Sequence, residues 1–472
     1  MIFNSLIFVL FFTVVSFVYF FIPHKYRWAL LLVASCYFYM YFLPIYIFIL
    51  GFTIVVDYYA GIFISSSTGK RRKFWLICSL VANIGVLAFF KYYNFLNENL
   101  TDMLDIFHYQ NPLPYLSILL PVGLSFHTFQ AMSYTIEVYR GNYPAEKHFG
   151  IYALYVMFYP QLVAGPIERP GNLLPQFRTK HYFDYDRVVS GLRLMLWGFV
   201  KKLIIADRLS LYINAVYANV HHHSSKSMWL AAFFFILQIY CDFSSYADIA
   251  IGSARVMGFN LMTNFNRPFV ARTVQNVWKR WHISLMTWFR DYLYFPLGGN
   301  RKGIAITIRN MVIVFAISGL WHGASWTFVI WGLVNGFVLG AEQVLKPYFG
   351  FVKKWPFLLR SVLGVVYAGT LFTAMGVFFR SYNIRQAGYM LKSMFTFKRG
   401  GLFFGEPHSN FYYCIFAAAF LLIADHIQEY KPGVLILGNK SVYVRYCGYT
   451  ILITLLLLTG VFNGGQYIYF QF

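Results

Sequence analysis

Residues 317–336 read ISGLWHGASWTFVIWGLVNG, an apolar stretch that contains one histidine, His322, and no formally charged side chain. Long apolar runs flank this stretch on both sides. A protonatable imidazole is costly inside a bilayer unless it faces a protein interior or a wet cavity. We therefore expect His322 to line a water-accessible hole, and it is a candidate functional residue.

The composition of the chain is that of an all-α polytopic membrane protein. Of its 472 residues, 59% are hydrophobic and only 12% are charged, whereas a soluble domain carries about 25% charged residues. A spanning helix needs about 20 apolar residues, so we expect about eleven transmembrane helices in a single domain, residues 1–472. The five cysteines are scattered without a C-x-x-C pair, which indicates neither a disulfide framework nor a metal site.

Basic loops predict the orientation of the chain. HKYR (24–27) and GKRRK (69–73) fall on one side of the membrane, and the acidic loop 97–112 falls on the other. Lys and Arg gather in cytoplasmic loops, so we expect an extracytoplasmic N-terminus. The first apolar run lacks a basic leader and an A-x-A-like site, and we expect it to be a retained span. The predicted spans are residues 2–22, 28–43, 45–64, 74–92, 115–136, 187–206, 228–254, 304–320, 324–345, 360–379, 411–427 and 441–462.

The formal charge of +22 has two readings. Positive loops on the cytoplasmic side explain much of the excess. Basic patches for acidic membrane lipids, a phosphorylated donor or an acidic polymer would add to it. Nucleic acid is not expected as a partner, because the basic residues are spread among membrane spans.

Two segments are too irregular for lipid-facing helices. Residues 150–185 are rich in Pro and Gly, and residues 259–303 mix aromatic and charged side chains. Broken backbone and charge at membrane depth must be enclosed by protein or water. We expect re-entrant and interfacial helices around a central funnel there, and an aromatic interfacial anchor in the tail, residues 463–472.

Three blocks concentrate the polar residues. In WKRWHISLMTWFRDYLYFPLGGNR (278–301), a helix would place Trp278, His282, Leu285 and Phe289 on one face. The alternative is an interfacial amphipathic helix. In GLWHGASW (319–326), small residues permit close backbone approach around His322, and Trp321 and Trp326 would wall the site. The alternative is a packing motif with a core histidine.

The third block, FYPQLVAGPIERP (158–170), is more consistent with a structural re-entrant loop, in which Glu168 and Arg169 form a local ion pair.

Other chemistries have weaker signals. The histidines at 221–223 are adjacent, a spacing unlike that of zinc ligands. Asp242 and Asp248 suit polar networks or a proton path. Phosphate-loop and G-x-S-x-G motifs are absent from the sequence.

The two histidine blocks resemble those of the membrane-bound O-acyltransferase family. PVGLSFHTFQAMSYTIEVYRG (121–141), FYPQLVAGPIERP and the terminal IYFQF are similar to the bacterial branch that O-acetylates alginate and other polysaccharides. The resemblance extends from the first span to the last residue. The D-alanyl transfer proteins of teichoic acid share the two histidines and match the other blocks less well.

The resemblance implies an O-acyltransferase of the bacterial inner membrane. It would take an acetyl group from cytoplasmic acetyl-CoA, a donor substrate, with no further cofactor. His322 and His282 would be catalytic, with His322 as general base, either directly or after a transient acyl-histidine, and imidazole suits a base near neutral pH. His282 would orient the donor or polarise its carbonyl. Donor-binding candidates are Trp278, Arg280, Arg290, Asp291, Trp321 and Trp326, and lipid phosphate is an equal partner for Arg280, Arg290 and Arg301.

The resemblance also implies partners outside the membrane. Relatives work with a secreted or membrane-anchored acetyltransferase of the SGNH-hydrolase type, and the acceptor is either that partner or an extracellular polysaccharide. The polymer and the oligomeric state stay open. Buried His and Asp residues would also serve proton-coupled or anion transport, but the sequence lacks the paired, symmetrically interrupted spans of such transporters. A structural scaffold for polymer export is a third possibility.

Overall fold

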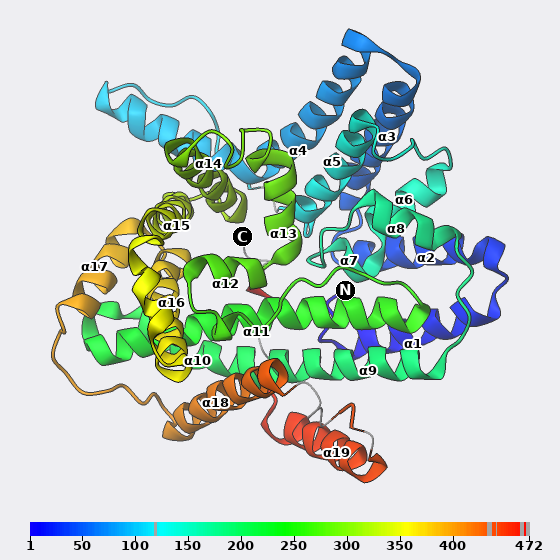
Figure 1. The fold of residues 1–472 in the computed structure, drawn as a ribbon. Coiled ribbons are helices and arrows are strands. Elements are labelled where there is room, and N and C mark those ends of the chain that lie inside the picture. Colours follow the sequence, from blue (N-terminus) through cyan, green and yellow to red (C-terminus); the bar gives the residue numbers. More distant parts are fainter. Residues whose placement is uncertain (118–119, 432–436, 440, 463–466, 469–472) are drawn as a thin grey trace. The chain divides into compact units, whose positions relative to one another are not determined.

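The computed structural model describes residues 1–117, 120–431, 437–439, 441–462 and 467–468. Its secondary structure in these residues is helical, without strands (Figure 1). Contacts group the chain into two compact units, residues 1–195 with 247–262 and residues 196–246 with 263–472. The single domain expected over residues 1–472 stays a prediction, because this grouping does not test whether the units fold separately.

The first unit packs its early helices around buried polar side chains. Asp57 on α3 accepts hydrogen bonds from Ser79 (2.6 Å) and Asn83 (2.9 Å) on α4. These bonds satisfy a carboxylate that would otherwise be costly among apolar spans. The helices of this unit are α1 (Leu6–Phe21), α2 (His24–Met40), α3 (Tyr46–Ser66), α4 (Gly69–Ile106), α5 (Leu124–Arg140), α6 (Phe149–Met157), α7 (Tyr159–Leu162), α8 (Pro170–Arg178) and most of α9 (Tyr185–Phe199).

The second unit contains both histidine blocks. The long helix α11 (Ser225–Met257) contributes its first part to this unit and its last part to the other. The remaining elements are η1 (Val200–Ala206), α10 (Asp207–Ala218), η2 (Val220–His222), η3 (Pro268–Val270), α12 (Val274–Arg280), α13 (Ile283–Phe289), η4 (Arg290–Tyr294), α14 (Ile304–His322), α15 (Trp326–Leu345), η5 (Tyr348–Lys354), α16 (Phe357–Arg380), α17 (Ile384–Phe395), α18 (His408–Tyr430) and α19 (Val442–Thr459).

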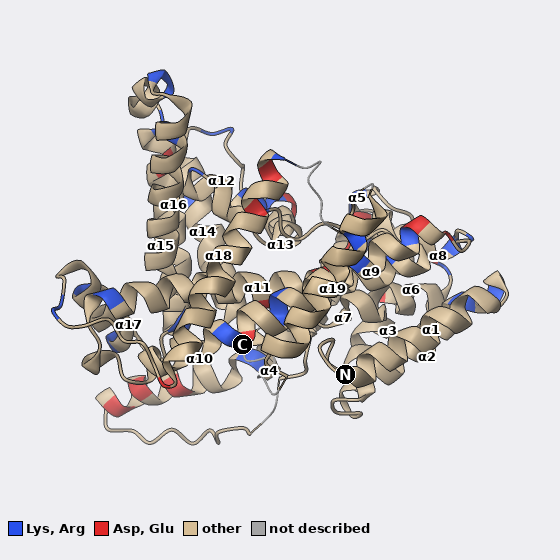
Figure 2. Cartoon of the chain, turned by 90° about the horizontal axis from the view of Figure 1, so that it is seen from below, with Lys and Arg blue, Asp and Glu red and all other residues tan. Residues whose placement is uncertain are grey.

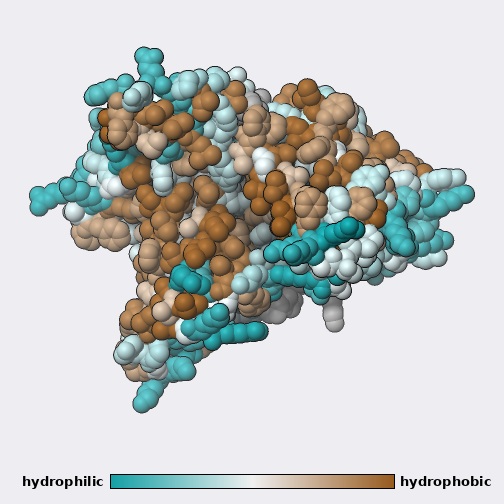
Figure 3. All heavy atoms as spheres, turned by 90° about the horizontal axis from the view of Figure 1, so that it is seen from above, coloured by the Kyte–Doolittle hydropathy of each residue, from teal (hydrophilic) through white to brown (hydrophobic). Residues whose placement is uncertain are grey.

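Eight of the described helices are long and apolar enough to cross a membrane, fewer than the eleven or so expected. They are α3, α4, α11, α14, α15, α16, α18 and α19. The predicted spans at 2–22, 28–43, 115–136 and 187–206 are occupied by the shorter helices α1, α2, α5 and α9. Apolar side chains cover much of the face seen in Figure 3, as lipid contact requires. The chain is a multi-pass membrane protein.

The irregular segments contain short helices, as the sequence predicts. Residues 150–185 include α6, α7 and α8, which have nine, four and nine residues. The interfacial tail expected at 463–472 lies outside the described residues except for Tyr467 and Ile468. Figure 2 shows Lys and Arg near helix ends, for example where α15 and α16 are joined.

Helices α14 and α15 approach each other closely because glycines face the neighbouring backbone. A Cβ atom on Gly319 would lie 2.2 Å from the carbonyl oxygen of Phe328, and one on Gly332 would lie 2.2 Å from that of Phe315. Small residues allow such contact between membrane helices. The pairing places His322, at the end of α14, against α15.

We expect Gly332→Ala to destabilise the protein by about 1–3 kcal/mol, because the added methyl group overpacks the contact between α14 and α15. The measurement is the thermal unfolding midpoint of the purified protein in detergent. Gly388→Ala is the control, since nothing lies within 4 Å of a Cβ atom there. Equal midpoints for the two variants would contradict the close contact.

Candidate active site

His322 is fixed at the end of a helix. It is the last residue of α14, and Gly323 follows in extended conformation. The hydroxyl of Ser325 then caps α15 by accepting the Thr327 backbone N–H. His322 is only 5% exposed. The turn between two tightly paired helices therefore sets the position of the imidazole.

Aromatic rings surround His322. Its ring lies 4.8 Å from that of Trp321, 5.2 Å from Trp331 and 5.3 Å from Phe379, between ring centres. The imidazole lines a cavity of about 20 Å³, and one water molecule needs about 10–15 Å³. The hole is therefore narrower than expected, and substrate entry requires a side chain of its wall to move.

His282 occupies a break between two short helices, not a position on one continuous helix. The expectation that Trp278, His282, Leu285 and Phe289 share a helical face is wrong, because α12 ends at Arg280 and α13 begins at Ile283. His282 between them has left-handed backbone angles, φ 46° and ψ 51°. Such a conformation costs a non-glycine residue about 1–3 kcal/mol, and it clusters at functional sites.

Asn264 holds this break in place. Its backbone oxygen accepts the N–H of Ile283 (2.8 Å). Its side-chain Oδ1 accepts the backbone N–H of Ser284 (3.3 Å) and the Ser284 hydroxyl (2.9 Å). Asn264 thus satisfies the first N–H groups of α13, which have no partner within the helix.

The side-chain oxygen of Asn264 determines which nitrogen of His282 carries the hydrogen atom. Oδ1 of Asn264 lies 3.1 Å from His282 Nδ1. The Ser284 N–H identifies this atom as an oxygen, so Nδ1 donates to it. In the neutral imidazole Nε2 therefore carries the lone pair.

Burial keeps His282 neutral. The residue is 1% exposed, and its ring packs edge-on against Phe243, with 4.6 Å between ring centres. Desolvation lowers the pKa of His282 from 6.5 to about 3. At physiological pH this imidazole is an uncharged hydrogen-bond acceptor at Nε2.

Trp321 joins the two histidines. Its ring lies 6.0 Å from that of His282 and 4.8 Å from that of His322. Trp278 reaches the same group from α12, because it lines the His322 cavity and donates Nε1–H to Asn335 Oδ1 (3.1 Å). The structure thus brings together both predicted catalytic residues and two of the predicted donor-binding residues.

The other predicted donor-binding residues lie elsewhere. Arg280 pairs with Glu429 on α18 (2.8 Å), which Arg267 also contacts (3.0 Å). Arg290 pairs with its neighbour Asp291 (2.8 Å) at the surface. Trp326 is 52% exposed and does not line the His322 cavity. Their roles toward a donor stay predictions.

Glu168 is bound into the backbone of the first unit. It is fully buried and accepts hydrogen bonds from Asn172 Nδ2 (2.7 Å) and the Met262 N–H (2.5 Å). Burial raises its pKa to about 7. Arg169 donates to the Ser133 hydroxyl (3.0 Å). These contacts fit the structural reading of block 158–170.

Sequence reasoning missed two supports of the site. Asn264 gave no local signal, since it lies 18 residues before His282. Lys202 gave one, as a lysine within the apolar run 187–206. Its buried Nζ lies 2.7 Å from Asp242 Oδ1 and 2.9 Å from Asp207 Oδ1. Asp242 belongs to α11 and directly precedes Phe243, whose ring packs against His282. The cluster therefore holds the part of α11 that contacts His282.

Comparison with known proteins defines the class. Residues 146–383, which contain both histidines, match the membrane-bound O-acyltransferase family. The chain is 37% identical to the probable alginate O-acetylase of Pseudomonas aeruginosa, over 84% of this chain and 75% of that protein. It is 33% identical to the peptidoglycan O-acetyltransferase of Helicobacter pylori, over 84% and 80%. The teichoic acid D-alanyltransferase of Bacillus subtilis is 26% identical over 50% of this chain and 60% of that protein.

The chain belongs to the membrane-bound O-acyltransferase family and is an O-acyltransferase. Within the family it belongs to the bacterial branch of the alginate and peptidoglycan O-acetyltransferases, as its sequence blocks predicted.

We expect His282→Gln to make stability less dependent on pH. The folded pKa of His282 lies below the unfolded value of 6.5, so the unfolded state binds the extra proton on acidification and wild-type stability falls as pH drops below 6.5. Between pH 7.5 and 5.5 this loss is about 1.4 kcal/mol. The variant should therefore lose about 1.4 kcal/mol less of its free energy of unfolding between these pH values than wild type does. Denaturant unfolding at both pH values measures this difference. An identical loss in both proteins would contradict a neutral, buried His282.

Proposed function

We propose that this enzyme transfers an acetyl group from cytoplasmic acetyl-CoA to hydroxyl groups of an extracytoplasmic polysaccharide such as alginate or cellulose. The observation that carries the proposal is the pair of buried histidines joined by Trp321, within the segment that matches the family. The names of the alginate and peptidoglycan relatives, which match over most of the chain, support acetyl as the group and a polysaccharide as the acceptor.

His322 is the general base in this proposal. An acceptor hydroxyl oxygen attacks the thioester carbonyl carbon while His322 removes the hydroxyl proton. The carbon–sulfur bond then breaks, the acetyl ester remains on the acceptor, and the proton passes to the leaving thiolate of coenzyme A. A positioned base contributes about 100- to 10,000-fold to such a step. The aromatic walls leave room for about one water molecule beside His322, which limits competing hydrolysis of the thioester.

His282 orients the donor in this proposal. Its Nδ1–H is engaged by Asn264, so the neutral ring offers a lone pair at Nε2 and no second N–H. This favours acceptance of an amide N–H or a hydroxyl over polarisation of a carbonyl. The low pKa of His282, about 3, also makes it a weak base.

The proposal places the protein in the bacterial inner membrane with its N-terminus outside. Acetyl-CoA is a substrate, and the reaction needs no further cofactor. The acetyl group reaches the polysaccharide directly or through a secreted or membrane-anchored SGNH-type acetyltransferase. Membrane lipids surround the spans.

We expect His322→Ala to abolish O-acetyl esters on the exopolysaccharide of cells that depend on this protein, since the base is lost. Mass spectrometry of the polymer measures the esters, and membrane levels of the protein are checked in parallel. The exposed His222 on η2 provides the control, His222→Ala.

The other outcomes contradict the proposal. Unchanged esters in His322→Ala would indicate a scaffold. Loss of D-alanyl esters in place of acetyl esters would indicate the teichoic acid reaction. Uptake of a solute without thioester turnover would indicate a transporter.

We expect Asn264→Ala to lower kcat by about 100-fold, because misplacing a reacting group by about 1 Å costs that much. Asn264→Asp retains an acceptor for His282 Nδ1–H and should lose less activity. The measurement is the rate at which wild type and the variants release free coenzyme A thiol. Their unfolding midpoints are measured in parallel, so that a loss of activity is not a loss of folded protein. Equal activity in Asn264→Ala and wild type would contradict the positioning role.

A further inference from the structure

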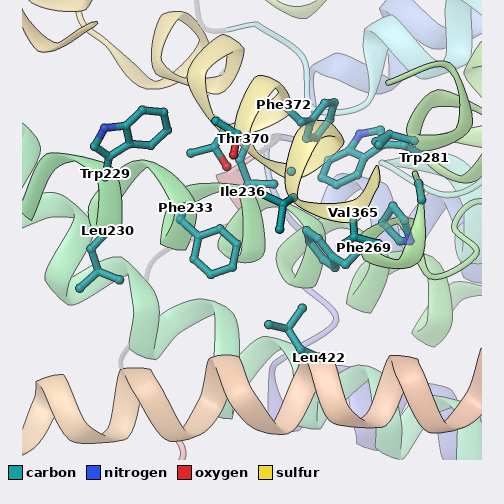
Figure 4. A pocket seen from close by; sticks show the side chains of 16 residues that line it. Trp229, Leu230, Phe233, Ile236, Phe269, Trp281, Val365, Thr370, Phe372 and Leu422 are labelled. Atoms are coloured by element: carbon teal, nitrogen blue, oxygen red, sulfur yellow. The ribbon is translucent and has the colours of Figure 1, made fainter. Parts of the chain in front are cut away.

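A large apolar pocket lies beside the His322 cavity. It has a volume of about 510 Å³, within the range of about 300–1,000 Å³ for ligand sites. Figure 4 shows Phe233 and Phe269 pointing into it, with Leu422 on the opposite side. Its lining is apolar except for two threonines, Thr370 and Thr373, and the indole nitrogens of Trp229 and Trp281.

The pocket is framed by membrane spans. Trp229 to Ile236 lie on α11, Val365 to Thr373 on α16 and Leu422 on α18, and all three helices are candidate spans. Val366 on the rim is 58% exposed, so the pocket opens on the surface that lipid would cover. Lipid hydrocarbon is the solvent around the spanning part of these helices.

Its depth matches the inner part of a lipid chain. Val365 to Thr373 lie 8 to 16 residues beyond Phe357, the first residue of α16. At 1.5 Å per residue this is about 12–24 Å from the end of the helix. One leaflet of hydrocarbon is about 15 Å deep, half of a 30 Å core. The pocket therefore lies near the middle of the bilayer.

Basic side chains lie close to Phe357, at the N-terminal end of α16. The guanidinium of Arg272 lies 4.7 Å from the ring centre of Phe357, and that of Arg360 lies 5.9 Å from it. Lys353 and Lys354 precede the helix. Figure 2 shows blue Lys and Arg segments where α15 and α16 are joined. Arginines and a helix N-terminus together favour a phosphate group.

We propose that this pocket holds an acyl chain of a resident membrane phospholipid whose phosphate binds Arg272 and Arg360. Ile236, Trp281 and Phe372 line both the pocket and the His322 cavity. The lipid chain supports these side chains from behind and so sets the width of the cavity. It is neither acyl donor nor acceptor, and the proposal does not depend on the proposed reaction.

The test is photocrosslinking of the full-length protein in nanodiscs that contain phosphatidylglycerol with a diazirine near the end of one acyl chain. Peptide mass spectrometry maps the adducts. We expect adducts concentrated on residues 229–236 and 365–373. The His322→Ala variant should give the same map, which separates this result from failure of the proposed reaction.

Two variants test the occupant. Gly369→Trp places a ring into the pocket, where a Cβ atom has no neighbour within 4 Å, and should reduce these adducts at least tenfold. Gly388→Trp on α17, where a Cβ atom also has no neighbour within 4 Å, is the control. Arg272→Gln with Arg360→Gln should reduce adducts from the phosphatidylglycerol probe, and to a smaller extent those from a diacylglycerol probe.

Three results would overturn the proposal. Adducts spread equally over the exposed faces of α4 and α19 would indicate bulk lipid only. Unchanged adducts in Gly369→Trp, with an unfolding midpoint like that of Gly388→Trp, would exclude the pocket. Displacement of the probe by acetyl-CoA would assign the pocket to the donor.

Discussion

The hydrogen bonds accepted by Asn264 are the constraint on which the site depends. They begin α13, hold His282 in a left-handed conformation and choose its tautomer. The left-handed backbone and the buried imidazole are both unfavourable in free energy, and the surrounding contacts offset this. Such strain is typical of functional sites. Asn264 acts together with the hydrogen bond from the Asn266 N–H to the Arg280 carbonyl oxygen (2.9 Å), which lies at the other side of the break.

The second histidine depends on a different constraint, the glycine-mediated contact of α14 with α15. This contact directs His322 toward Trp331, while Trp321 connects it with His282. The aromatic wall lowers the local dielectric constant and so strengthens electrostatic interactions inside the cavity. It also limits the cavity to about 20 Å³, so the reaction requires movement of the wall. The proposed lipid chain lies behind that wall.

The sequence predicted the features that depend on local hydrophobic patterns. The spans expected at 304–320 and 324–345 are observed as Ile304–His322 and Trp326–Leu345, and the contact between Trp321 and His322 follows from their place on one helix end. Tertiary contacts could not be predicted in this way. The break at His282 depends on Asn264, and Arg280 pairs with Glu429, 149 residues away. A periodic pattern carries no information on such partners.

In the proposed reaction, His322 removes a proton during acetyl transfer from a thioester. The most direct measurement is the release of coenzyme A thiol from acetyl-CoA by the purified protein in nanodiscs, with and without a polysaccharide acceptor. We expect acceptor-dependent release by wild type and a rate reduced by about 100- to 10,000-fold in His322→Ala. Equal rates for the two proteins would contradict the proposed role of His322.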